Sequence, residues 1–235
     1  MRRTLLAVAA AFNLTVLSFA GGGGSPETIL PEVSEHLRLA RRCALSGNLE
    51  RGLAHTEVVS PDKKIRVRVD CGDLTGSQQT PMRNALAGAM KLWSDALGED
   101  LFEVGETGIA NVIVKFQLDV RDRGVSVAAH VDWTRGVANE LVSPTPVLTA
   151  QITMRTRALN GMPLDFDQMR ASLAHELGHV IGLSDSRKPG MIMSVMDYRH
   201  PALNIQYSEV AELMQARREA KALRVQFLAK AQKAR

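Results

Sequence analysis

The stretch from residue 175 to residue 185, HELGHVIGLSD, constrains this chain more than any other part of its sequence. It opens with the pattern H-E-x-x-H, and side chains four positions apart lie on one face of an α-helix. His175 and His179 can therefore bind one metal ion together. Glu176 lies between them, about 100° round the helix, where its carboxylate can reach a water molecule on the metal. The pattern predicts two metal ligands and a general base on a single helix.

The residues that follow predict a third ligand. Gly182 is expected to end the helix in a left-handed turn, which reverses the chain. This reversal brings the carboxylate of Asp185 back toward the two histidines. Two imidazoles and one carboxylate suit Zn²⁺ and leave a fourth position open for water. We therefore expect one catalytic zinc ion, bound by His175, His179 and Asp185.

The sequence before the motif predicts the rest of this helix. Asp165 is a good N-cap, and Gln168 three residues later completes a capping-box pattern. Apolar residues then recur at helical spacing, at Met169, Leu173, Leu177 and Val180. Because this stripe projects away from the histidines, we expect it to face a hydrophobic core while the histidines face a cleft.

These residues resemble the metzincin superfamily of zinc peptidases, and within it the matrixins, which carry H-E-x-x-H-x-x-G-x-x-H. Asp185 stands where most matrixins have a third histidine, as in secreted bacterial metzincins of the snapalysin type. The resemblance implies a Met-turn beneath the metal, and residues 194–198 (SVMDY) fit its pattern with Met196. Met193 is the alternative, because its distance from Asp185 matches the shorter matrixin spacing. Tyr198 would lie near the metal and the transition-state oxyanion, as in astacin-type relatives.

The resemblance also implies a function and a fold. The function is that of a zinc-dependent endopeptidase acting on protein or peptide substrates, with Glu176 as the general base. The fold is α+β: a twisted, mostly parallel sheet with an antiparallel strand at the edge of the cleft, packed on the active-site helix, with a long C-terminal helix. A different class of function stays open, an exported zinc-containing binding module without catalysis, which the basic C-terminal helix would support.

Alternating apolar residues predict the order of elements in the proposed catalytic domain, residues 63–215. Strands are expected near residues 65–69, 111–118, 125–131 and 147–155. A helix is expected to begin at Pro81, with Thr80 as its cap, and to end at Gly98. By the resemblance, Val147–Arg155 would line the cleft and pair with extended substrate. From Ser208 onward the chain is expected to be one helix, and residues 216–235 form its basic extension.

The N-terminal region divides into two parts. Residues 1–20 carry two arginines, an apolar run and a small-residue cleavage pattern, as in a secretory signal peptide; an uncleaved membrane anchor is the alternative. We therefore expect a secreted or periplasmic protein with no stable membrane insertion after cleavage. Residues 21–62 begin with a glycine-rich linker and contain a predicted helix at 32–46. They are either a removable pro-segment or an extension packed on the domain.

Two cysteines, Cys43 and Cys71, predict one disulfide in an exported chain. The alternative is a cysteine switch of the matrixin type, with Arg42-Cys43 as its only matching pair. The formal charge of +4 falls to +2 once the two signal-peptide arginines are removed, and this gives no argument for nucleic-acid binding. Matrixins hold a structural zinc and calcium ions in a loop rich in glycine and aspartate. The corresponding stretch of this chain lacks the glycines of that loop, so no second zinc is expected there. It contains four residues that could bind an ion: Asp119, Asp122, His130 and Asp132.

Overall fold

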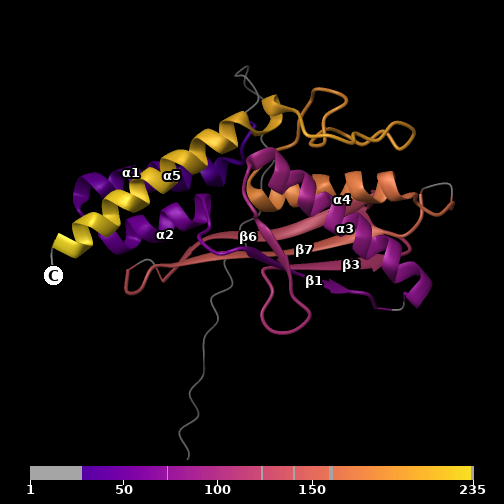
Figure 1. The fold of residues 1–235 in the computed structure, drawn as a ribbon, viewed down its shortest axis with the longest axis horizontal. Helices are drawn as coiled ribbons and strands as arrows, with labels where there is room; N and C mark the ends of the chain where they lie inside the picture. Colours follow the sequence, from indigo (N-terminus) through magenta and orange to yellow (C-terminus); the bar gives the residue numbers. More distant parts are fainter. Residues whose placement is uncertain (1–27, 73, 123, 140, 159–160, 234–235) are drawn as a thin grey trace, which may run out of the picture.

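The structure, a computed structural model, describes residues 28–233 except residues 73, 123, 140, 159 and 160. The predicted signal peptide and the glycine-rich linker lie outside the described residues. The elements in chain order are α1 (Pro31–Ser46), α2 (Leu49–Val59), β1 (Ile65–Asp70), α3 (Gly76–Leu97), β2 (Phe102–Val104), β3 (Val112–Gln117), β4 (Arg121–Asp122), β5 (Val125–Ser126), β6 (Ala129–Ala138), β7 (Thr145–Arg155), α4 (Phe166–Ile181) and α5 (Tyr207–Lys233). The chain is α+β, as predicted, and ends in a long helix (Figure 1).

The main sheet has five strands in the order β2-β1-β3-β7-β6. The first four run parallel, and β6 pairs antiparallel with β7 at one edge. The prediction that residues 147–155 form the cleft-edge strand is wrong, because β7 is hydrogen-bonded to a neighbour on each side. Alternation along that stretch shows that one face is buried, but it carries no information about which strands lie beside it.

Helices α3 and α4 lie side by side over one face of this sheet (Figure 1). The indole of Trp93 on α3 is fully buried and donates a hydrogen bond of 2.7 Å to the carbonyl of Ala174 on α4. The predicted stripe of α4 is buried in the core formed by these helices and the sheet. The predicted start of α3 is wrong. The helix begins at Gly76, with a capping box between Thr75 and Gln78, and continues through Pro81.

The remaining helices, α1, α2 and α5, pack on one another beside the sheet, and we call them the three-helix layer (Figure 1). Phe227 on α5 is fully buried against α2, where a Cβ on Gly52 would lie 2.3 Å from its ring. The N-terminal region is thus packed on the rest of the protein, and Ile29, Leu30 and Val33 share its hydrophobic core. Within the described residues, no helix combines the length and apolarity needed to cross a membrane.

The predicted disulfide is wrong, because Cys43 and Cys71 are not joined. Cys43 is buried on α1, which packs within the three-helix layer. Cys71 follows β1, and its Sγ lies 3.4 Å from Nη2 of Arg83 on α3. The even count of cysteines predicted a pair, but Cys43 is buried on α1 whereas Cys71 follows β1 of the sheet. The burial of Cys43 there also leaves the cysteine switch without support.

Candidate metal centre

The helix α4 begins and ends as its sequence predicts. Asp165 accepts a hydrogen bond of 2.8 Å from the backbone N–H of Gln168, whose side chain accepts one of 3.1 Å from the N–H of Asp165. At the other end Gly182 has φ 112°, in the left-handed region. Its N–H donates to the carbonyls of Gly178 and His179, which closes the last turn. The chain then doubles back alongside the helix.

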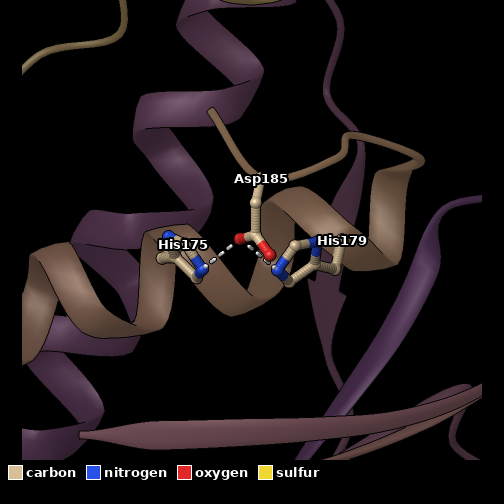
Figure 2. A group of neighbouring side chains, drawn as sticks. All are labelled: His175, His179 and Asp185. Atoms are coloured by element: carbon tan, nitrogen blue, oxygen red, sulfur yellow. Dashed lines mark ion pairs between the residues drawn. The ribbon is translucent and has the colours of Figure 1, made fainter. Parts of the chain in front are cut away.

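This reversal brings the three predicted ligands together. Oδ1 of Asp185 lies 3.2 Å from Nε2 of His175 and 3.4 Å from Nε2 of His179. Figure 2 shows both imidazoles directed at the carboxylate from one face of α4. All three ligand atoms lie within 4.8 Å of one another. Among the described residues, no other group of three or more His, Cys, Asp or Glu side chains is as closely gathered.

Two backbone carbonyls fix the orientation of the imidazoles. Nδ1 of His175 lies 2.9 Å from the carbonyl oxygen of Ile192, and Nδ1 of His179 lies 2.8 Å from that of Leu183. A carbonyl oxygen can only accept, so each Nδ1 carries the proton in these bonds. When the ring is neutral, its Nε2 therefore carries a lone pair that faces Asp185, and when the ring is protonated, its Nε2–H donates a hydrogen bond to that carboxylate. Proteins hold metal-binding histidines in this way.

The donor set fits a zinc ion. Ligands about 2.0–2.1 Å from a tetrahedral zinc lie about 3.3 Å from each other, which agrees with the two nitrogen–oxygen distances at Asp185. Two neutral imidazoles and one carboxylate also match the ligand types of catalytic zinc sites. The three side chains therefore meet the requirements of such a site in both chemistry and spacing.

The charges within this cluster are strongly coupled. Hydrogen bonds from His175 and then His179 hold the pKa of Asp185 well below its ordinary value. Burial acts to lower the pKa of His175, but its hydrogen bond to Asp185 and the charge of Glu176 outweigh this, and the net pKa is raised. The centre therefore attracts a positive charge, which a cation can supply.

Glu176 is buried next to the cluster, with 7 % of its surface exposed. Burial raises the pKa of its carboxyl, against the opposing influence of His175, His179 and His130. No hydrogen bond holds this carboxylate among the residues that the structure describes. A buried carboxylate with a raised pKa and no fixed partner has the properties of a general base.

The two methionines that fit the Met-turn occupy different places. Met193 is 2 % exposed and packs against α4, where a Cβ on Gly178 would lie 2.2 Å from its Sδ. It directly follows Ile192, whose carbonyl orients His175. Met196 is half-buried and accepts a hydrogen bond of 3.3 Å from the hydroxyl of Ser172. The geometry thus favours Met193, the alternative, over Met196 as the residue that supports the centre.

Tyr198 lies near this cluster without a hydrogen bond to it. Its backbone carbonyl accepts a hydrogen bond of 2.8 Å from Gln168 on α4. Burial, and in smaller part the negative charge of Glu176, raise the pKa of its hydroxyl, while Arg155 opposes them. The side chain is half-buried, and its hydroxyl is close enough to Glu176 for that charge to act on it.

The other candidate residues take part in local pairs elsewhere. His130 lies 3.1 Å from Asp132 on β6, and Asp119 pairs with Arg121. Asp122 lies in the short strand β4. The exposed ring of His200 pairs with Asp197 at 3.2 Å.

Sequence patterns missed three residues that support the centre. Trp133 on β6 stacks on His179, with ring centroids 5.6 Å apart and planes 15° apart. Glu209, buried at the start of α5, accepts hydrogen bonds from the N–H groups of Met193 at 3.0 Å and Gln206 at 2.8 Å. Arg135 is half-buried and donates hydrogen bonds to two carbonyls near the C-terminal ends of α2 and α4, those of Val58 and Val180. Of the three, only Glu209 could have been found from the local sequence, because it stands at a helix-capping position three residues after Gln206.

Comparison with protein-family models gives no match for this chain, and a search of curated proteins finds no relative. The functional interpretation therefore rests on the residues and geometry of the centre itself.

Proposed function

We propose that this protein is an exported, metzincin-type zinc endopeptidase that binds one Zn²⁺ through His175, His179 and Asp185. The observation that carries the proposal is that both imidazole rings are held in the orientation that metal binding requires. Both Nδ1–H groups are bound by backbone carbonyls, and both Nε2 atoms are directed at the Asp185 carboxylate. Proposed export rests on residues 1–20 of the sequence alone.

The proposed reaction is hydrolysis of a peptide bond. A zinc ion, when bound, lowers the pKa of water and polarises the scissile carbonyl. Glu176 accepts a proton from the attacking water while the water oxygen forms a bond to the carbonyl carbon of the substrate. It then delivers that proton to the leaving nitrogen as the carbon–nitrogen bond breaks. We assign Tyr198 the role of donating a hydrogen bond to the developing oxyanion.

The role of pairing with extended substrate passes from residues 147–155 to β6. This strand is the last of the sheet, so its outer edge can accept a further strand. Its Trp133 lies against His179, which places this edge next to the centre. Pairing through backbone groups tolerates many substrate sequences.

The test compares the wild type with Glu176→Gln, which keeps the size of the side chain and removes its basicity. We expect one zinc per chain in both proteins, and chelator-sensitive casein cleavage at least about a thousandfold slower in the variant. Glu106→Gln, in an exposed loop, is the matched control and should cleave like the wild type. Substantial cleavage by the zinc-loaded Glu176 variant would contradict the role of base. Absence of zinc from the wild type would contradict the centre itself.

The binding-module alternative loses support from the packing of α5. Two of the arginines that make this helix basic are buried and turned inward. Arg217 pairs with Glu99 at 2.7 Å, and Arg224 pairs with Asp62. These charges hold the helix to the rest of the fold, so they are not offered to a partner.

A further inference from the structure

The first described residues of the chain are hydrogen-bonded to the turn that carries the metal ligands. The N–H of Leu30 donates to the carbonyl of Gly182 at 2.8 Å, and the N–H of Ser184 donates to the carbonyl of Thr28 at 3.0 Å. Between these bonds Ile29 and Leu183 form an antiparallel bridge. Residues 28–30 thus pair, through one isolated bridge, with a turn that lies far from them in the sequence.

This turn determines the position of two ligands. The carbonyl of Leu183 accepts the Nδ1–H bond of His179, and Asp185 follows two residues later. A displacement of the turn would rotate the His179 ring and move the Asp185 carboxylate at the same time. Only His175 is oriented from elsewhere, by the carbonyl of Ile192.

Residues 28–33 are themselves held from two sides. The backbone N–H of Thr28 donates to Oε2 of Glu212 on α5 at 3.0 Å, and its hydroxyl donates to the same oxygen. Val33, fully buried, covers the turn so closely that a Cβ on Gly182 would lie 2.7 Å from its Cγ2. The contact therefore joins the start of the chain, the last helix and the ligand turn.

We propose that residues 28–33 are a positioning segment for the metal centre, and that metal affinity depends on them. The inference rests on the metal site of the proposed function, but it does not depend on peptidase activity. It also means that residues 28–33 belong to the working protein. Their removal would leave the N–H of Ser184 and the carbonyl of Gly182 without their partners, beside the ligands.

A single substitution can remove the key hydrogen bond. Leu30 has φ −61°, which is the φ of proline, so Leu30→Pro removes the N–H with little strain. Leu30→Ala loses the same buried side chain but keeps the N–H, and it is the matched control. We expect zinc affinity at least about tenfold weaker in Leu30→Pro than in Leu30→Ala. We also expect faster amide exchange at Ser184 in the proline variant only.

A second pair of variants avoids the core. Glu212→Ala removes the exposed carboxylate that holds Thr28, whereas Glu219→Ala removes one on the same helix that pairs with Arg41 of α1. We expect zinc affinity about threefold weaker in the first and unchanged in the second. This pair decides the question if the Leu30 variants fail to fold.

The outcomes separate the two proposals. Equal zinc affinity within each folded pair, with zinc bound by the wild type, overturns the positioning role and leaves the proposed function standing. A wild type that binds no zinc overturns both. Weaker binding confined to Leu30→Pro and Glu212→Ala supports the positioning segment, whatever the proteolytic activity.

Discussion

At the scale of single residues, position 185 decides what the centre can bind. Its carboxylate oxygen lies within 3.4 Å of both imidazoles, so no other side chain among the described residues can replace it as third ligand. The exposed Asp185 side chain also contributes little to the core. Under the proposed function, changes at this position therefore act on metal binding with little effect on folding.

We predict that Asp185→Asn weakens zinc binding by at least about a hundredfold, since a ligand contributes more than an outer-shell partner. Asp185→His, which places an imidazole there as in most matrixins, should retain zinc. Competition with a metal-binding dye would measure both affinities, and Asp197→Asn, at another exposed aspartate, serves as the control. Unchanged zinc affinity in Asp185→Asn would remove this residue from the centre.

Single-residue patterns could predict only those parts of the centre that lie close in sequence. The spacing of His175, Glu176 and His179 on one helix, followed by Gly182, fixed the reversal that brings Asp185 back. Met193 was ranked below Met196 because two patterns competed, and only the packing on Gly178 separates them. Trp133 could not be found, because its contact with His179 depends on which strand lies at the edge of the sheet.

At the scale of elements, the contact between α3 and α4 depends on a glycine near the C-terminal end of α4. Gly178 lies against Met193 and Trp93, so α4 approaches both side chains closely. Glycine inside a helix is otherwise unfavourable by about 1 kcal/mol relative to alanine. The close approach explains why this position keeps it.

We predict that Gly178→Ala lowers the free energy of unfolding by about 1–3 kcal/mol, because its Cβ would lie 2.2 Å from the Met193 sulfur. Gly88→Ala is the control within α3. Its Cβ would meet only side-chain atoms of Arg170 and Phe166, at 3.0 Å or more, and the arginine can move. Chemical denaturation should show no loss for the control, and equal stability of the two variants would contradict the packing argument.

Most elements followed from local pattern, and the errors have physical causes. Helix α3 begins before its proline because the Thr75–Gln78 capping box starts it earlier, and one lost hydrogen bond at Pro81 is tolerated. Helix α2 went unpredicted, since its buried face depends on contact with α5. The short strand β2 has three residues, too few for a pattern to emerge.

At the scale of the whole molecule, a charge cluster holds the three-helix layer to α3. Glu99, just after α3, accepts hydrogen bonds from Arg217 at 2.7 Å and Lys221 at 2.6 Å on α5. Burial acts to raise the pKa of Glu99, but bonds from Lys221 and Arg217 outweigh it, and the net pKa is lowered. Arg217 is buried, so this carboxylate compensates its charge.

We predict that Glu99→Gln lowers the free energy of unfolding at pH 7 by about 2 kcal/mol, less than for a fully buried pair because Glu99 is partly exposed. A carboxyl with a lowered pKa contributes stability above its ordinary value of 4.5 and loses it as pH falls through the folded value. The difference from wild type should therefore shrink in acid. Asp95→Asn, in an exposed pair with Lys91, is the control. A difference that persists unchanged at low pH would contradict the ionic explanation.

The arrangement of the whole chain was the least predictable level. The sequence of residues 21–62 predicted a removable pro-segment or an extension packed on the domain, but not that α1 and α2 pack on the C-terminal helix. That pairing depends on contacts such as Phe227 against Gly52, which no local pattern reveals. The prediction of a disulfide failed for the same reason, because it depended on how α1 and β1 lie relative to each other, which local patterns do not show.

The contacts that α5 makes beside the proposed metal ligands determine when the centre can form during synthesis. Glu209 and Glu212 both lie in α5, and they hold the Met193 turn and Thr28. A ribosome makes the chain from its N-terminus, so this helix emerges after the histidines and Asp185. A nascent chain thus has every ligand before it has the two carboxylates that hold the Met193 turn and Thr28. Under the proposed function, the order of synthesis itself delays full proteolytic activity until α5 has packed beside the centre.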